Sequence, residues 1–374
     1  GDAGSDNQHG GPEPQARRLP CCQFFFTQIL KFYDEEKRDF PWRTFSPNPY
    51  HVYISEIMLQ QTTTTTVKNY FLRFIQQFPA LDALAKVDVS AVFLLWQGLG
   101  YYSRARNLHK AAQIMSAQGG IPNQYTDLIA LPGIGDYTAK AILAIAFNEP
   151  VLPIDGNIKR VFARYFGLAA PYEQLHAIIE KMEFDFQGRS GDICQGLMDF
   201  ANIICLPKTP KCAQCSLQQS CQAYLTNKVD VLPRPKKRVE KKLMLMDGLV
   251  CIKDGCIGLN LHKSGTLLGG LWNIPMVDSE AVFPDVTSSC AQHLELVRAG
   301  IQKEKLGLSP CGVVGCQVFL SSGKPIRHIF THIDLRLTLR FLEDLECDEF
   351  VPLSNLSDYP LSRLTMKVIE NIRL

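Results

Sequence analysis

The sequence predicts a multidomain protein in which an all-α region is followed by an α/β domain. Three observations predict this class. Apolar residues recur at helical spacing, punctuated by Gly and Pro, over residues 21–225. A basic, proline-interrupted stretch over residues 226–241 has the composition of an interdomain linker. From residue 242 to residue 374, shorter apolar runs and Asp-Gly pairs indicate strands with intervening helices.

Composition limits the class of protein further. The chain has 374 residues, enough for two separate cores, and its net charge of +2 means that any nucleic-acid surface is local. No apolar run reaches the roughly 18 residues of a membrane span. Residues 1–20 lack an apolar segment, so we expect a disordered tail rather than a secretion signal. The 13 cysteines are then expected as thiols or metal ligands in a reducing compartment.

The period of the apolar residues assigns individual elements. In the first region the clearest helices are Tyr50–Thr62 and Tyr137–Phe147. In the second region the expected strands are Leu243–Ile252, Cys256–His262 and Leu335–Phe341. We expect turns at Asp247-Gly248 and Asp254-Gly255, the latter closing a hairpin, and helices near residues 288–304 and 362–373.

Four cysteines form the strongest local pattern: Cys205, Cys212, Cys215 and Cys221. Six, two and five residues separate successive members, so that four thiolates can surround one metal centre. Such a set can hold either zinc or an iron–sulfur cluster. Zinc ribbons usually combine two Cys-x2-Cys pairs, and this pattern has one, which favours the cluster. The module would span residues 194–225.

Two further motifs place glycines or a carboxylate at the start of a predicted helix. In the run Leu131–Gly135, the residues Gly133 and Gly135 would leave backbone N–H groups free to hold a phosphate. A glycine-rich turn between two packed helices would have the same sequence. Asp155 follows an apolar run and precedes a helix that begins near Gly156, a position that N-capping alone would explain.

Two segments mix polar or charged groups with apolar and aromatic ones. Glu56 lies in a predicted helix, where partial burial would raise its pKa and let it donate a proton at neutral pH. A solvated glutamate on a helix face is the simpler alternative. The segment Leu99–Arg106 places two tyrosines beside two arginines, which suits base stacking and phosphate neutralisation. Core tyrosines with surface arginines would account for it equally well.

Taken in order, these motifs resemble those of the MutY-type adenine DNA glycosylases, a branch of the helix–hairpin–helix superfamily. The resemblance runs from about residue 24 to residue 374 and includes Ser-Glu-x-Met-Leu-Gln-Gln-Thr, Gly-Leu-Gly-Tyr-Tyr-Ser-Arg, Leu-Pro-Gly-x-Gly and x-Asp-Gly-Asn. It implies a monofunctional base excision repair enzyme that hydrolyses the N-glycosidic bond of adenine opposite 8-oxoguanine, or opposite guanine, in duplex DNA. It also implies a [4Fe–4S] cluster on the four cysteines.

The resemblance assigns catalytic roles to residues at matching positions. Glu56 would protonate adenine N7, and Asp155 would stabilise the positive charge that develops on the sugar. Asn157 would orient Asp155. Tyr137 stands where relatives with lyase activity carry a lysine nucleophile, so no Schiff base is expected there. Lys140, one helical turn further on, leaves weak lyase-like trapping open.

The resemblance also assigns contacts to DNA. The backbone N–H groups of Gly133 and Gly135 would hold a phosphate. The residues that wedge into the duplex around 8-oxoguanine would be Gln61, Thr62, Leu99 and Tyr101. The adenine pocket would include Trp42, Arg43 and Asp199.

The C-terminal domain, residues 242–374, resembles a Nudix fold, with Leu267–Pro275 in its early strand region. The acidic helix with which Nudix hydrolases bind Mg²⁺ is absent from the sequence that follows, so we expect no pyrophosphatase activity. The family recognises 8-oxoguanine through a Phe-Ser-His loop, and the matching residues here are Phe330, Thr331 and His332. Thr331 keeps the hydroxyl donor of the serine that it replaces.

Three other classes of protein fit parts of this pattern. They are a bifunctional endonuclease III-like glycosylase and AP lyase, a non-catalytic DNA-damage binding protein, and an iron–sulfur electron carrier. Tyr137 argues against the first class, and the carboxylates Glu56 and Asp155 argue against the second. We expect a monomer without membrane association. A bacterial source would make the protein cytoplasmic and nucleoid-associated, while a nuclear or organellar location stays open.

Overall fold

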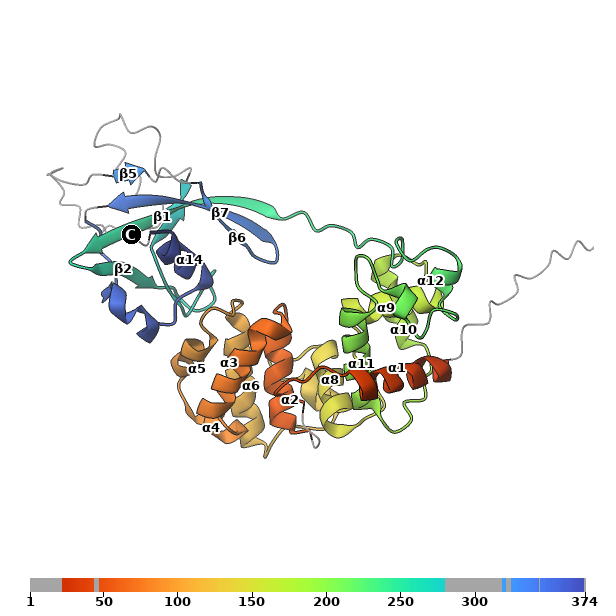
Figure 1. Cartoon of the computed structure of the whole chain (residues 1–374). Helices are drawn as coiled ribbons and strands as arrows, with labels where there is room; N and C mark the ends of the chain where they lie inside the picture. The colour runs from red at the N-terminus through yellow and green to blue at the C-terminus, as the bar shows by residue number, and fades with distance from the viewer. Residues whose placement is uncertain (1–21, 44–46, 280–317, 321–323, 343, 373–374) are drawn as a thin grey trace, which may run out of the picture. The chain divides into compact units, whose positions relative to one another are not determined.

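The computed structural model of the chain describes residues 22–43, 47–279, 318–320, 324–342 and 344–372 (Figure 1). The chain forms two compact units. Unit 1 comprises residues 1–39 and 139–237, and unit 2 comprises residues 40–138 and 238–374. The helix expected near residues 288–304 lies outside the described residues. In the part of the chain that is described, no helix is both long enough and apolar enough to cross a bilayer.

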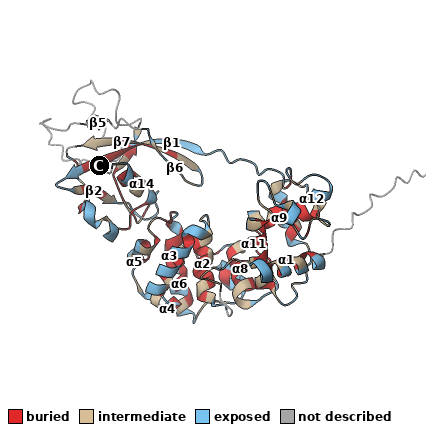
Figure 2. Ribbon diagram, viewed as in Figure 1, coloured by how far each residue is buried: buried red, intermediate tan, exposed pale blue. Residues whose placement is uncertain are grey.

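Unit 1 is helical. Its elements are α1 (Cys22–Glu36), most of α8 (Asp136–Phe147), α9 (Gly156–Phe166), η1 (Tyr172–Gln174), α10 (Leu175–Glu180), α11 (Ser190–Ile203), η2 (Cys212–Gln214) and α12 (Gln222–Leu225). Helix α1 buries Phe25, Phe26, Ile29, Leu30 and Tyr33, which recur at intervals of three and four along one face. The ring of Phe25 stacks on that of Tyr165 in α9, with 4.5 Å between centroids. Figure 2 shows that most of α9 is buried, so this helix is central to the unit 1 core.

The helical part of unit 2 contains α2 (Pro49–Leu59), α3 (Thr64–Gln77), α4 (Leu81–Lys86), α5 (Val89–Trp96), α6 (Ser103–Ala117) and α7 (Tyr125–Ile129). The helix expected over Tyr50–Thr62 is confirmed. It begins after Asn48, whose side chain accepts hydrogen bonds from the N–H groups of Tyr50 and His51. It ends early because Gln60 has ψ of 116° and Gln61 has φ of 58°, both outside the helical region.

The described residues of the C-terminal part of unit 2 form a mixed sheet and the helix α14. Its elements are β1 (Lys242–Lys253), β2 (Cys256–Leu261), β3 (Trp272–Asn273), β4 (Met276–Asp278), β5 (Val318–Leu320), β6 (Ile326–Ile329), β7 (Ile333–Leu342), β8 (Glu349–Pro352), η5 (Leu353–Asp358) and α14 (Arg363–Ile372). The main strand order is β3-β2-β1-β7-β5, with β1 and β7 parallel and the β1–β2 hairpin antiparallel. The apolar face of α14, with Leu364 and Val368, packs against the sheet core around Leu337. The predicted multidomain class, helical followed by α/β, is confirmed.

One expected turn was wrong. Asp247-Gly248 lies inside β1, where both residues pair with β4 and β7. A Cβ atom at Gly248 would lie 2.8 Å from Ile274 and 3.0 Å from Leu337, so the glycine permits close packing of the sheet rather than a turn. The hairpin at Asp254-Gly255 is confirmed, and both residues have positive φ angles of 51° and 73°.

Candidate active site and DNA-binding surface

Asp155 is the N-cap of α9 in unit 1. Its Oδ1 accepts a hydrogen bond from the N–H of Ile158 at 2.9 Å, and its Oδ2 accepts one from Asn157 Nδ2 at 3.1 Å. Burial raises the pKa of Asp155 above the usual 3.8, and the hydrogen bonds from Ile158 and Asn157 and the charge of Arg160 oppose that rise. The carboxylate is therefore largely withdrawn from water yet held in one orientation, which suits an anion that stabilises a developing cation.

Arg160 and Arg164, one turn apart on α9, were not singled out from the sequence. Arg160 donates to Asn157 Oδ1 at 3.1 Å and to the carbonyl of Cys205 at 2.9 Å. Arg164 donates to Cys205 Sγ at 3.5 Å and to the carbonyl of Leu206 at 2.7 Å. One helix therefore carries the capping carboxylate at its start and anchors the cysteine loop further along. The sequence signal was available, since both arginines fall on the buried face of an otherwise apolar helix.

The four cysteines line one cavity in unit 1, beside Arg164 and Tyr165. Among the residues that the structure describes, no three of these sulfur atoms all lie within 4.8 Å of one another. A single tetrahedral zinc ion with Zn–S bonds of about 2.3 Å needs sulfur atoms roughly 3.8 Å apart.

Burial in this cavity favours the neutral, protonated form of three of the thiols. Burial, with smaller contributions from the three other thiols and against a hydrogen bond from Leu217, raises the pKa of Cys215 to about 12. Burial is likewise the first cause of the raised pKa values of Cys212 and Cys221. Four thiolates in this cavity would repel one another unless a positively charged metal core held them ionised.

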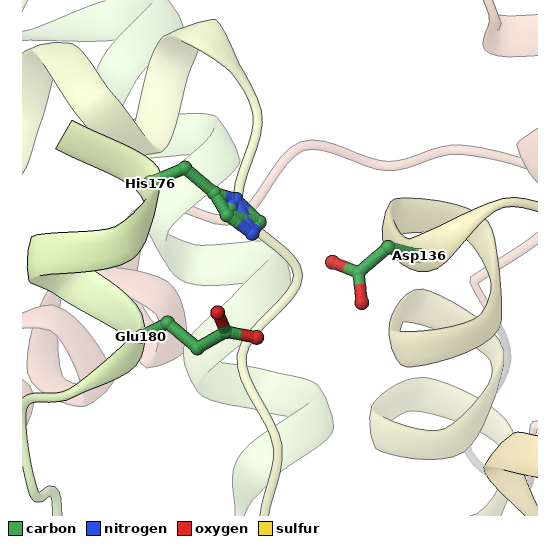
Figure 3. A group of neighbouring side chains, drawn as sticks. All are labelled: Asp136, His176 and Glu180. Carbon is green, nitrogen blue, oxygen red and sulfur yellow. The ribbon is translucent and has the colours of Figure 1, made fainter. Parts of the chain in front are cut away.

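Lys140, on α8 in unit 1, forms an ion pair with Glu180. Its Nζ lies 2.9 Å from Glu180 Oε1, and the lysine side chain is 14% exposed against 53% for the glutamate. Figure 3 shows Glu180 and His176 projecting from α10. An ammonium group held in an ion pair is a poorer nucleophile than a free amine, because pairing favours the protonated form.

Asp199 lies on α11 in unit 1 and is fully buried. Its Oδ1 accepts from Arg38 Nε at 2.6 Å, and its Oδ2 accepts from the backbone N–H of Arg38 at 2.9 Å. Arg38 is a further residue that the sequence patterns did not single out, because the two partners lie 161 positions apart. Asp199 is thus a buried, paired carboxylate and is held in a fixed position.

Glu56 and Tyr137 belong to unit 2. Glu56 is half-buried on α2, where Ile57 and Met58 are buried. Tyr137 lies in the first turn of α8, directly after the glycine turn. The hairpin is formed by α7, the turn and α8, and Tyr125 donates to Asp136 Oδ1 at 2.7 Å across it. The Asp155 carboxylate belongs to the other unit.

The glycine turn is exposed at both of its glycines. Gly133 has φ of 76°, and a Cβ atom there would lie 2.9 Å from Asn107 Cβ. A Cβ atom at Gly135 would meet nothing within 4 Å. Gly133 is therefore required by the backbone conformation, whereas Gly135 leaves open space in front of the start of α8. Space and a helix N-terminus together suit a phosphate.

Arg104 connects the two loops that carry Gln61, Thr62 and Tyr101. One guanidinium nitrogen donates to the carbonyls of Ile57 and Met58, at 2.9 and 2.8 Å, and to the carbonyl of Gln60. The other donates to Thr62 Oγ1 at 3.1 Å and to the carbonyl of Gly100 at 3.1 Å.

These contacts hold two strained residues at the surface. Gln61 and Tyr101 both have positive φ angles, of 58° and 50°, which non-glycine residues rarely adopt. Both side chains are exposed, Tyr101 to 38%. Leu99, in contrast, is 2% exposed and belongs to the core. The structure therefore brings Gln61, Thr62 and Tyr101 together around Arg104, with Leu99 beneath them.

Trp42 and Arg43 lie before α2. The ring of Trp42 stacks on Phe40 at 4.8 Å and meets Phe71 edge-on at 5.6 Å. The guanidinium of Arg43 lies 4.9 Å from the centre of the Phe40 ring. Both residues are half-buried, so aromatic and cationic surfaces remain available beside α2.

Phe330, Thr331 and His332 form the tip of the β6–β7 hairpin. Phe330 N–H donates to the carbonyl of Ile333 at 2.8 Å, which closes a turn with Thr331 and His332 exposed between the two strands. The tip and Tyr101 line the same cavity of about 570 Å³ within unit 2. Tyr102 donates to the carbonyl of Leu361 at 2.6 Å at this end of the unit.

Comparison with known proteins finds a family that matches part of the helical region. Residues 54–183 match the HhH-GPD superfamily of base excision DNA repair proteins. These residues are an HhH-GPD domain. The adenine DNA glycosylase of Buchnera aphidicola subsp. Baizongia pistaciae is 40% identical over 210 residues, 55% of this chain and 60% of that protein. The adenine DNA glycosylase of Arabidopsis thaliana is 30% identical over 371 residues, 84% of this chain and 56% of that protein.

A solved thermostable thymine-DNA glycosylase is 31% identical, with a TM-score of 0.48 over 54% of this chain and 96% of that one. The chain spans less than two thirds of the length of the two curated relatives. The HhH-GPD domain contains Glu56, the glycine turn, Tyr137 and Asp155. The cysteine loop and the Phe330–His332 tip lie outside it.

Proposed function

We propose that this protein is a monofunctional adenine DNA glycosylase that removes adenine opposite 8-oxoguanine in duplex DNA. The observation that carries the proposal is the half-buried Asp155 carboxylate, held at the start of α9 by Ile158 and Asn157 inside an HhH-GPD domain. Loss of neutral adenine leaves positive charge on the sugar, and an anion preorganised in a poorly hydrated site stabilises that charge. The adenine must first leave the base stack.

Glu56 is the proposed general acid. Adenine is a poor leaving group unless a ring nitrogen is protonated as the C–N bond breaks. A half-buried glutamate between Ile57 and Ser55, which are both buried, can donate that proton and later help to activate water. Tyr137 cannot form a Schiff base, and the Nζ of Lys140 is held in an ion pair with Glu180. Together these residues support hydrolysis without strand cleavage.

Cys205, Cys212, Cys215 and Cys221 would hold a [4Fe–4S] cluster. When bound, such a cluster would cross-link the loop and keep the four thiols ionised. The single Cys-x2-Cys pair supports this choice over zinc, since zinc ribbons usually combine two such pairs. Arg164 would remain beside the cluster, where its contact with Cys205 Sγ offsets negative charge.

Recognition of 8-oxoguanine is proposed for the cavity between Tyr101 and the Phe330–His332 tip. The cavity offers aromatic rings for a base and the exposed hydroxyl of Thr331 for a hydrogen bond. Gln61 and Thr62 would approach the same lesion from the loop after α2. The exposed Gly133 turn would hold a phosphate of the DNA backbone.

The test is release of adenine from duplexes that carry adenine opposite 8-oxoguanine, with adenine opposite thymine as the control. We expect release from the damaged pair alone, and single-turnover rates reduced about 10²–10⁴-fold by Glu56→Gln and about 10²–10³-fold by Asp155→Asn. Release from neither duplex by protein with a full iron content would refute the proposal. Strong borohydride trapping on an oxidised pyrimidine would instead support an endonuclease III-like lyase.

A further inference from the structure

The cavity of about 570 Å³ in unit 2 has a strongly basic wall that base recognition does not use. Arg363 and Lys367, on the first two turns of α14, and His328 of β6 line it together with Phe330 and Tyr101. Among the described residues that line this cavity, none is acidic. A cavity with aromatic rings at one side and cations at another differs from an ordinary apolar pocket, because it suits a ligand that is aromatic in one part and anionic in another.

The basic groups of this wall lie close enough to disfavour one another. Lys367 Nζ is 3.3 Å from His328 Nδ1 and donates to the carbonyl of Arg327 at 3.2 Å. Burial, followed by the charges of Lys367 and Arg363, lowers the pKa of His328 to about 4. Burial and Arg363 also lower the pKa of Lys367, against a weaker opposing influence of Glu370. His328 is therefore neutral at pH 7 and accepts a hydrogen bond from Lys367, while the two remaining cations share one region of positive potential.

Arg327 differs from its neighbours because its guanidinium is already held in an ion pair. It forms an ion pair with Asp334 at 2.7 Å, and Asp334 also pairs with Arg336 at 3.1 Å. Arg363 and Lys367 are spaced i and i+4, so both side chains lie on one face of α14. Arg106 also lines the cavity, where it donates to the carbonyl of Gly269. Arg363 and Lys367 are the two cations that α14 presents to the cavity.

We propose that Arg363 and Lys367 form a binding site for a backbone phosphate of the nucleotide that carries the 8-oxoguanine. This proposal rests on the function proposed above. An arginine fork and a lysine ammonium are the donors that proteins use for phosphate, the first directional and the second a point charge. Neutral His328 supports Lys367 without adding a competing positive charge. The cavity would bind the whole damaged nucleotide, with the base beside Tyr101 and Phe330 and its phosphate beside α14.

The test combines a change in the DNA with a change in the protein. Binding is measured on duplexes in which 8-oxoguanine faces a cleavage-resistant 2′-fluorinated adenine nucleotide. One of the two phosphates that flank the 8-oxoguanine is replaced by an uncharged methylphosphonate. For the unaltered protein, we expect one replacement to weaken binding about tenfold, in the range of a lost charge-assisted contact. The double variant Arg363→Gln/Lys367→Gln should bind the charged duplex about tenfold more weakly than the unaltered protein. Its affinity should not change when the methylphosphonate replaces the phosphate.

Salt dependence provides an independent readout. The slope of log Kd against log salt concentration should fall by about one in the double variant, as expected for one lost phosphate contact. Lys253→Gln is the matched control. Lys253 lies at the far end of β1 from Lys242, which pairs with Ile333 beside the hairpin tip. This control should keep both the salt slope and the sensitivity to methylphosphonate.

Equal sensitivity to methylphosphonate in the unaltered protein and the double variant would overturn the site. Binding of free 8-oxo-dGMP that depends on Arg363 and Lys367, with no effect of either methylphosphonate, would overturn its assignment to DNA. Adenine release is measured on the same preparations. Failure of the unaltered protein to release adenine would contradict the proposed function, whereas normal release with an unchanged double variant would contradict this inference alone.

Discussion

Replacing Arg104 by methionine should both destabilise unit 2 and impair recognition of the lesion. The side chain is buried, and burial lowers its pKa to about 10, so it is still charged at pH 7. The methionine would fill part of the space without any donor. The buried carbonyl of Met58 would lose its donor, at about 1–3 kcal/mol, whereas that of Ile57 would keep the N–H of Gln60. Contacts to Thr62 and Gly100 would be lost as well.

The expected decrease in unfolding free energy is about 3 kcal/mol. The lost hydrogen bonds are partly offset, because the variant no longer has to bury a charged guanidinium when it folds. For a domain of this size that corresponds to a decrease in Tm of roughly 10 °C. Thermal or urea unfolding measures it. Lys110→Met removes an exposed cation from the same helix and should change the unfolding free energy by less than about 0.5 kcal/mol.

Activity distinguishes a positioning role of Arg104 from simple instability. Gln61 and Tyr101 keep their positive φ angles only while both loops are held, so the variant should lose preference for adenine opposite 8-oxoguanine over adenine opposite guanine. The ratio of the two single-turnover rates, corrected for the active fraction, is the measurement. The rate ratio of Arg104→Lys should lie between those of the unaltered protein and Arg104→Met, because one ammonium cannot reach both loops. An Arg104→Met protein with unaltered Tm and unaltered preference would refute this reasoning.

Three further predictions concern the turn, the capping carboxylate and the cysteine loop. Gly133→Ala should weaken binding to undamaged duplex and lower the unfolding free energy by about 1 kcal/mol or more, because Gly133 has φ of 76° and lies close to Asn107. Gly119 also has a positive φ, of 97°, but lies in open space, so Gly119→Ala should lower stability without changing DNA binding. Asn157→Ala removes a hydrogen bond that lowers the Asp155 pKa, so the acidic limb of the pH–rate profile, where protonation removes the anion, should move to higher pH; a limb that stays in place would contradict the role of Asp155. Cys215→Ser should reduce bound iron and lower the Tm, as measured by metal analysis and thermal unfolding, whereas Cys251→Ser in the other unit should leave the iron content unchanged.

Local signals in the sequence located most of the elements that matter for the site. The helix over Tyr137–Phe147 and the strand over Leu243–Ile252 were expected within one residue of their observed ends, because their apolar periods are long and uninterrupted. The error at Asp247-Gly248 has a clear cause. A glycine beside an aspartate has the same local preference whether it forms a turn or makes room for Ile274 in a sheet, and the difference lies in residues distant in sequence.

The sequence by itself determined the chemistry that this protein carries: an aspartate at the start of a helix, a glycine turn, a glutamate in an apolar helix and four closely spaced cysteines. These depend on residue type and short spacing, which are local properties. Only the tertiary structure decided which long-range partners hold those groups. Arg38 reaches Asp199 across 161 positions, Arg160 joins Asn157 to the cysteine loop across 45, and Arg104 joins two surface loops. An arginine has no local preference that reveals its partner, because five donors on a long side chain can satisfy any carbonyls or carboxylates that folding brings within reach.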